Sequence, residues 1–261
     1  MSQSAPRMPV LFVGHGDPMI ALRDDAITRE LAAQGRAIRQ AYGQPRAILA
    51  VSAHWYTRGT FVQSAERPEQ VYDMYGFPAE LYHVKYPVKG FRPLTDAVLA
   101  ALGDGVAVND GWGIDHGAWT VLVHLFPEAD IPVVQLSLDG TLPPERHYEI
   151  GQKLAALREA GYLILGSGNV AHNLRRVDWD NPGGSNETVA FNRAVIDRVT
   201  ARDDRALVDY RRLPSAAYAV PTPDHYLPLL YCLGAAEQDK ATVFNDACML
   251  GSIAMTGFLF A

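Results

Sequence analysis

Short apolar runs alternate with longer amphipathic segments along the chain. The apolar runs lack the alternation of a half-exposed strand, so they indicate strands buried on both faces; they are Pro9–Val13, Ala47–Ser52, Pro132–Leu138, Tyr162–Leu165 and Ile253–Phe260. A helical period of apolar positions predicts helices over Asp24–Tyr42, Phe91–Leu102, Ala118–Phe126, Pro143–Ala160 and Glu187–Thr200. This alternation predicts an α/β fold, with three αβα layers around a central, largely parallel or mixed sheet.

The organisation of the chain predicts a single domain over residues 1–261. The length suits one large domain or two small ones. No internal repeat, low-complexity segment or linker rich in Pro, Gly and Ser divides the sequence. We therefore expect one hydrophobic core system organised around one sheet.

Composition and charge narrow the class of protein. Hydrophobic residues make up 48% of the chain and the formal net charge is −6, without a cluster of Lys and Arg, so we expect no nucleic-acid partner. The two cysteines, Cys232 and Cys248, have no metal or redox spacing. The first ten residues lack a secretion signal and no apolar run is long enough to span a membrane. We expect a cytoplasmic protein with no membrane partner.

The positions of the histidines point to a functional site. His15, His54 and His172 follow shortly after predicted strands, in GHGDP, SAHW and GSGNVAH. His116 lies in a glycine-rich loop before a helix, and His225 lies in a loop that leads into one. Ligands of open α/β sheets bind beyond the carboxyl ends of the strands, which is where these side chains are predicted to lie.

Imidazoles that converge from separate strand ends are typical of a metal site. Imidazole is a common ligand of zinc and iron, and a catalytic metal needs positions left open for substrate. The alternative is that each histidine is a loop residue bonded to a backbone carbonyl. His15 and His54 repeat one strand-end arrangement, which favours the metal site. His83, His124 and His147 are predicted to be structural.

Six motifs together resemble a known family. They are GHGDPM, SAHW, YDMYGFP, GIDHGAW, GSGNVAHNL and TPDHYLPL, in this order. The set is similar to the DOPA 4,5-dioxygenase group of the class III extradiol ring-cleavage dioxygenases, within the LigB-like superfamily. The resemblance extends from His15 to about Leu229. Each motif is short, and the specificity comes from finding all of them in one order.

The resemblance implies an αβα fold, a non-haem divalent metal and a role for each histidine. It implies metal ligation by His15, His54 and His225, an acid/base role for His172 and a substrate-facing role for His116. Members of the family are iron(II) enzymes that open a catechol ring with dioxygen, and some bind zinc when isolated. The expected substrate is DOPA or a related dihydroxyphenyl compound, with 4,5-type cleavage.

Two positions depart from the family pattern. Asp17 stands where a small residue is expected, so it either alters the pocket or bonds a backbone amide. His225 stands where the protocatechuate branch has a glutamate, and neighbouring Asp224 is an alternative carboxylate ligand. Three imidazoles suit zinc as well as iron, but zinc has no accessible redox change, so ring cleavage requires iron or manganese.

The expected mechanism assigns two proton-handling residues. His172 is predicted to act first as base and then as acid, and His116 to hydrogen-bond a ring hydroxyl or the bound oxygen. No substrate-binding residue is assigned, although Arg175 and Arg176 lie near His172. A cluster of aromatic residues is interpreted as core or a loop clamp rather than a pocket wall: Tyr72, Tyr75, Phe77 and Tyr82.

Two other functions remain open from the sequence. One is a zinc-dependent hydrolase with His172 as base. The other is a non-enzymatic protein that binds a metal or a partner on the same fold. The sequence makes no prediction of oligomeric state.

Overall fold

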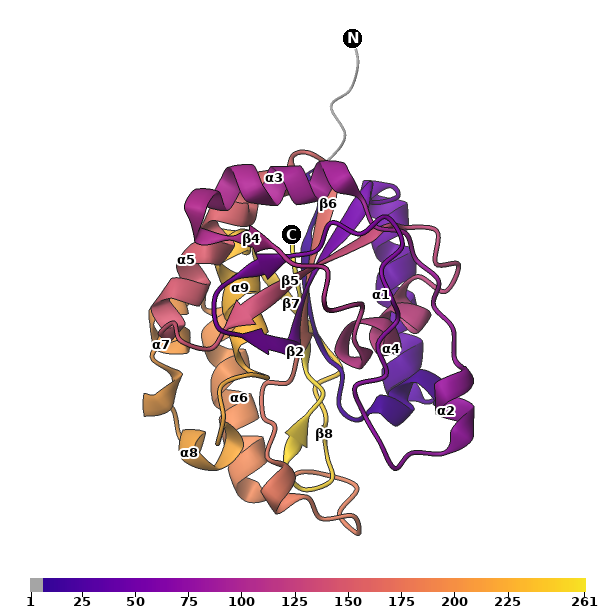
Figure 1. Ribbon diagram of the computed structural model, residues 1–261. Coiled ribbons are helices and arrows are strands. Elements are labelled where there is room, and N and C mark those ends of the chain that lie inside the picture. Colours follow the sequence, from indigo (N-terminus) through magenta and orange to yellow (C-terminus); the bar gives the residue numbers. More distant parts are fainter. Residues whose placement is uncertain (1–6) are drawn as a thin grey trace.

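An eight-stranded mixed sheet forms the centre of the molecule in the computed structural model, which describes residues 7–261 (Figure 1). The strand order is β4-β3-β5-β2-β6-β1-β10-β7. These strands are β1 (Val10–Gly14), β2 (Ala47–Thr57), β3 (Phe61–Val62), β4 (Ala107–Val108), β5 (Val133–Asp139), β6 (Tyr162–Gly168), β7 (Ala241–Phe244) and β10 (Gly257–Phe260). The central strands β5, β2, β6 and β1 are parallel, whereas β10 runs antiparallel to β1 and β7.

Helices cover both faces of this sheet, which confirms the predicted three-layer α/β fold. They are α1 (Ala26–Tyr42), α2 (Ala79–His83), α3 (Arg92–Leu102), α4 (His116–Leu125), α5 (Pro144–Leu154), α6 (Asn186–Thr200), α7 (Asp204–Val208), α8 (Ala216–Ala219) and α9 (Leu227–Ala236). In Figure 1, α1 and α4 lie on one side of the sheet, and α3, α5, α6 and α9 lie on the other. None of the helices in the described part of the chain combines the length and apolar character needed to cross a membrane.

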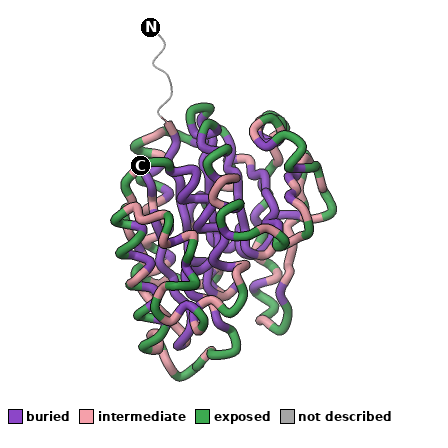
Figure 2. Tube along the Cα trace, turned by 90° about the vertical axis from the view of Figure 1, so that its left-hand side faces the viewer, coloured by how far each residue is buried: buried purple, intermediate pink, exposed green. Residues whose placement is uncertain are grey.

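The sheet separates two apolar clusters because successive strand residues point to opposite faces. Phe12 and Leu49 pack in the cluster that contains α3, α5, α6 and α9. Their neighbours Leu11 and Ile48 pack in the cluster that contains α1 and α4. All four side chains are fully buried, and Figure 2 shows the buried segments inside a layer of exposed turns. Burial on both faces explains why the strands read as continuous apolar runs.

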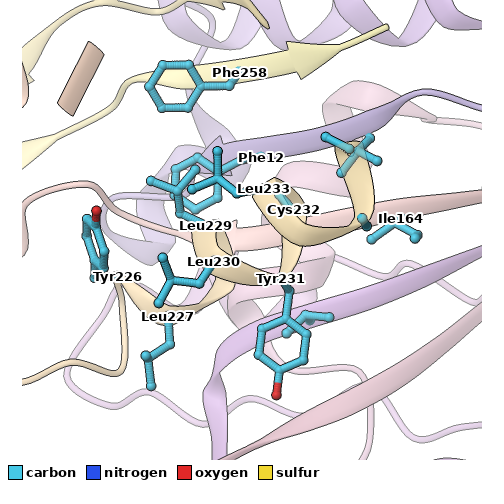
Figure 3. Packing of buried hydrophobic residues seen from close by; sticks show 14 of the residues in the cluster. Phe12, Ile164, Tyr226, Leu227, Leu229, Leu230, Tyr231, Cys232, Leu233 and Phe258 are labelled. Atoms are coloured by element: carbon cyan, nitrogen blue, oxygen red, sulfur yellow. The ribbon is translucent and has the colours of Figure 1, made fainter. Parts of the chain in front are cut away.

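Helix α9 is buried on every side, and its period could not be read from the sequence. All ten of its residues are buried, so no polar face marks the helical repeat. Leu229, Leu230 and Leu233 lie with Phe12 of β1 and Phe258 of β10 in the packing of Figure 3. The sequence predicted only that the loop carrying His225 leads into a helix, and α9 begins two residues later, at Leu227.

The apolar run Ile253–Phe260 was predicted as one strand, and this prediction is wrong. Ile253–Ala254 forms β9, which pairs with β8 (Cys248–Met249) in a separate two-stranded sheet. The central sheet receives only β10. Met255 and Thr256 separate β9 from β10 and belong to neither strand. The Thr256 hydroxyl donates to Asn192 Oδ1 of α6 at 2.7 Å. Uniform apolar character cannot reveal such a break.

The other predicted elements occur, with small changes in their bounds. The segment Pro143–Ala160 is α-helical only to Leu154 and continues as a 3₁₀ turn, η3 (Ala155–Arg158). The short strands β3, β4 and β7 and the short helices α2, α7 and α8 were not predicted, because they contain too few residues to display a period. Residues 1–6, most of the stretch inspected for a secretion signal, lie outside the described residues.

Candidate metal centre

Three histidines meet at the carboxyl ends of the parallel strands. His15 directly follows β1, and its backbone N–H donates to Gly168 O at the end of β6. His225 approaches the same point because its carbonyl passes over Gly168, where a Cβ would lie 2.1 Å from His225 O. Asn169 N–H donates to that carbonyl at 2.9 Å. The end of β6 therefore holds both histidine backbones.

His54 occupies a different position from the predicted one. The sequence placed it after a strand that ends at Ser52, whereas β2 continues to Thr57. The pairing of β2 with β5 shifts register between Val51 and Tyr56, so His54 lies inside an irregular stretch of strand. Such irregularities re-aim side chains at functional sites. Here the side chain reaches the imidazole of His15.

The imidazoles of His15, His54 and His225 form a compact group. One ring nitrogen of each lies within 4.8 Å of the others, and Nε2 of His15 is 3.2 Å from Nε2 of His54. The buried Nε2 of His225 has no hydrogen-bond partner among the described residues. An unpartnered buried nitrogen is costly unless a ligand satisfies it. The group can thus hold a cation.

The opposite ring nitrogen of each histidine has an outer partner. His15 Nδ1 lies 3.0 Å from Ser167 Oγ, and His54 Nδ1 lies 3.3 Å from Asp73 Oδ2. His225 Nδ1 bonds Asp224 Oδ2. Such partners fix the orientation of metal-binding imidazoles and leave Nε2 free for the cation. This donor set fits a divalent transition metal with open coordination positions.

A second group with metal-binding side chains, His54, Asp73 and His116, shares one member with the first. The Asp73 carboxylate lies 3.0 Å from His116 Nδ1 as well as near His54 Nδ1, and it accepts from His116 N–H at 2.9 Å. One carboxylate oxygen, Oδ1, therefore already accepts a backbone N–H, and the other, Oδ2, lies 3.3 Å from His54 Nδ1. We interpret Asp73 as a link between two imidazoles, and the three-histidine group as the better cation site.

Burial keeps the imidazoles of His15 and His54 neutral. Burial, and then the neighbouring imidazoles, lower the pKa of His15 and of His54 well below the usual value. Burial opposes ionisation of Asp224, but the hydrogen bond from His225 outweighs it, so the pKa of this carboxyl lies below its ordinary value. The neutral imidazoles of His15 and His54 present lone pairs to a cation without the need to lose protons.

His172 and His116 complete the site at its edge. The His172 ring stacks on the His225 ring, with 3.5 Å between centroids and an interplanar angle of 8°. Burial and His225 lower the pKa of His172 to about 3. His116 is the first residue of α4, which Asp115 caps by accepting from Ala118 N–H. Its ring centroid lies 3.9 Å from that of His54.

A cavity of about 640 Å³ opens onto these rings. Its lining includes His54, His116, His172 and His225. Most of the remaining wall is apolar, from Met19, Met74, Tyr75, Phe77, Leu174, Val177, Trp179, Leu250 and Ile253. A volume of several hundred Å³ with apolar walls and a few convergent polar groups is typical of a small-molecule site.

Comparisons with known proteins identify the family of the chain. A family described as "Catalytic LigB subunit of aromatic ring-opening dioxygenase" matches residues 9–260. The chain belongs to the LigB family of ring-opening dioxygenases. A protein of Escherichia coli (strain K12) named "4,5-DOPA dioxygenase extradiol" is 41% identical, with 97% of this chain and 94% of that protein covered. A protein of Beta vulgaris with the same name is 35% identical, covering 90% of each.

A solved structure shows the same fold. The crystal structure of an uncharacterized protein from Escherichia coli K12 matches with a TM-score of 0.84 and 38% sequence identity, covering 98% of this chain and all of the other. The resemblance of the six motifs to the LigB-like superfamily is confirmed. The family also supports the predicted class of reaction, a ring-cleaving dioxygenase, and an aromatic substrate with dioxygen.

The structure brings together all five predicted site histidines and adds residues that the sequence did not single out. Asp73 lies within YDMYGFP and Ser167 lies within GSGNVAHNL. Their place in these two motifs was the one signal in the sequence that could have pointed to them. The aromatic segment, interpreted as core or clamp, is divided. Tyr72 is partly buried and packs against Trp119 with the rings tilted by 57°, whereas Tyr75 and Phe77 line the cavity.

The remaining histidines lie away from the cavity. His83 is exposed at the end of α2, and His124 Nε2 lies 2.8 Å from Ile20 O. His147 of α5 is fully buried, with Nδ1 3.2 Å from the Tyr231 hydroxyl of α9. These positions agree with the structural roles expected for them.

The buried ring of His147 predicts a pH-dependent stability. Burial lowers its pKa to about 4, below the 6.5 expected for the unfolded chain. The unfolded state therefore binds more protons between these values, and stability falls as the pH drops. Between pH 7 and pH 5 we expect His147 to remove about 2 kcal/mol from the free energy of unfolding.

Urea unfolding of the wild type and His147→Gln at both pH values measures this contribution. The variant retains a hydrogen-bonding group for Tyr231 but does not titrate. The site histidines contribute equally to both proteins, so the difference isolates His147. Identical losses of stability in the two proteins on acidification would contradict the assignment.

Proposed function

We propose that the chain is an iron(II)-dependent extradiol dioxygenase that cleaves the ring of a catechol such as DOPA, with 4,5-type cleavage. The bond between a hydroxylated ring carbon and its unhydroxylated neighbour breaks, and both atoms of dioxygen enter the product, so no further oxidant is needed. Family membership and the names of the two relatives support the reaction class. The observation that carries the proposal for this chain is the three-imidazole group, two of whose rings, those of His54 and His225, line a largely apolar cavity.

His15, His54 and His225 hold the cation through Nε2 in this proposal. When bound, iron(II) supplies Lewis acidity toward the catechol hydroxyls and the one-electron chemistry that reaction with dioxygen requires. The chain's part is to fix the imidazoles through Ser167 and the carboxylates beside them. The engaged Nδ1 atoms prevent the rings from rotating away.

His172 and His116 handle the protons. Both rings line the cavity beside the proposed ligands, so they lie within reach of a hydroxyl on a bound ring. His172 accepts a proton from a catechol hydroxyl and returns it later in the reaction. Asp73 places His116 by accepting from its backbone N–H, and one ring nitrogen of His116 accepts a hydrogen bond from the second hydroxyl. The apolar wall contacts the faces of the ring.

Oxygen uptake by metal-loaded protein tests this function. Protein loaded anaerobically with iron(II) is mixed with DOPA or another catechol, and oxygen consumption and the yellow ring-cleavage product are recorded together. We expect one dioxygen consumed per catechol cleaved. The zinc-loaded protein, which has no accessible redox change, is expected to consume none. Absence of uptake across a catechol panel at full iron occupancy would overturn the proposal.

A further inference from the structure

The wall of the cavity carries one fixed positive charge. Among the described residues that line it, Arg23 is the single Arg or Lys and Asp17 the single carboxylate. Arg175 and Arg176, which the sequence placed near His172, are exposed on η4 (Leu174–Arg176) and do not line the cavity. A negatively charged group on a bound substrate therefore has one cationic partner in this cavity.

Local structure holds Arg23 in this wall. The loop after His15 continues into a 3₁₀ helix, η1 (Pro18–Leu22), and Arg23 is its C-terminal cap. Asp17 caps the other end by accepting from Met19 N–H at 2.9 Å, and its second oxygen accepts from Arg23 Nη2. One carboxylate thus shapes the turn and orients the guanidinium. The Arg23 side chain is 30% exposed, so it remains accessible from the cavity.

The guanidinium retains free hydrogen-bonding capacity. Arginine has five N–H donors, and Asp17 is its one acidic partner among the described residues. Arginine binds carboxylates through paired, charge-assisted hydrogen bonds, which fix both the position and the orientation of the bound group. Asp17, the residue that departs from the family pattern, therefore forms an ion pair with Arg23 on the cavity wall.

The size of the cavity leaves room for a substituent on the ring. A cavity of about 150 Å³ accommodates benzene, whereas this one has about 640 Å³. A catechol whose hydroxyls face the histidines fills only part of it. The apolar side chains of Met74, Phe77 and Leu250 line the wall elsewhere, so a charged substituent finds its counterpart only at Arg23.

We propose that Arg23 binds a carboxylate on the side chain of the catechol substrate, positioned by Asp17, so that the enzyme selects dihydroxyphenyl carboxylic acids. This inference rests on the proposed function. It predicts discrimination between 3-(3,4-dihydroxyphenyl)propionate and 4-ethylcatechol, two compounds that differ only in the carboxylate.

The test compares these two probes in wild type, Arg23→Gln and Arg23→Lys. In Arg23→Gln the ratio of KM for the propionate to KM for 4-ethylcatechol is expected to rise about 10- to 100-fold, as expected for loss of a hydrogen bond to a charged group. Lysine keeps the positive charge but lacks the planar pair of N–H donors. The KM ratio of Arg23→Lys is therefore expected to lie between those of the wild type and Arg23→Gln. Arg175→Gln removes an exposed arginine outside the cavity and is the matched control.

Binding without turnover separates this inference from the proposed function. Calorimetric titration under argon, with iron(II)-loaded protein, gives the affinity for both probes whether or not the enzyme cleaves them. A selective loss of propionate affinity in Arg23→Gln supports the inference even if oxygen uptake fails. Equal affinities of wild type and Arg23→Gln for the propionate, or equal losses for both probes, would overturn it.

Discussion

Replacing His172 with alanine is expected to lower kcat by about 10²- to 10⁴-fold, the usual contribution of a positioned acid/base group, while the protein keeps its iron. His172 stacks face to face on His225 but does not belong to the three-imidazole group. Loss of its nitrogens therefore removes the proton acceptor without removing a ligand. Oxygen uptake and iron content, measured on the same preparation, check both parts of this result.

The stacked geometry supplies a sharper variant. His172→Phe retains a flat ring against His225 and lacks both nitrogens, so it separates proton transfer from ring packing. It is expected to lose as much activity as His172→Ala. His83→Ala, at an exposed position outside the cavity, controls for the loss of a histidine. An unchanged kcat in iron-loaded His172→Phe would show that the residue moves no proton.

Replacing His15 with alanine is expected to remove both metal and activity. His15 donates one of three nitrogens that converge within 4.8 Å. Loss of an outer partner of a metal ligand costs about 10- to 100-fold in affinity, and loss of the ligand itself is expected to cost more. Competition with a chelator measures the iron affinity, and oxygen uptake is expected to fall with occupancy.

A graded series makes this prediction specific. Ser167→Ala deletes only the hydroxyl that faces His15 Nδ1 and is expected to weaken iron binding by about 10- to 100-fold. His15→Ala is expected to weaken it further, with a far-ultraviolet spectrum that shows the fold is retained. Wild-type iron affinity in a folded His15→Ala protein would mean that the cation is held elsewhere.

The layers of the fold could be predicted from the sequence, because burial on both faces leaves a direct signal in the apolar runs. Four of the predicted strands correspond to the parallel strands β1, β2, β5 and β6. The break at Met255 and Thr256 left no such signal, since it depends on a hydrogen bond to α6. Helix α9 was only partly foreseen, because a helix with no exposed face has no amphipathic period.

The sequence could predict only those site residues that combine a suitable residue type with a place at the end of a strand or the start of a helix. His15 and His225 follow from their places next to a strand and before a helix. Asp73 could not be found this way, because it lies outside any helix or strand and its role depends on tertiary contact with two imidazoles. Arg23 likewise resembles an ordinary surface charge until the cavity around it is known.

The position of β10 has a consequence for synthesis of the chain. This strand is the last in the sequence, yet it lies between β1 and β7 in the sheet and pairs with Val10, Leu11 and Phe12. Until residues 257–260 leave the ribosome, one edge of β1 has no hydrogen-bonding neighbour. The hydrogen-bonding edge of the strand that leads into His15 is therefore completed only after residues 257–260 have been synthesised, later than every histidine of the three-imidazole group.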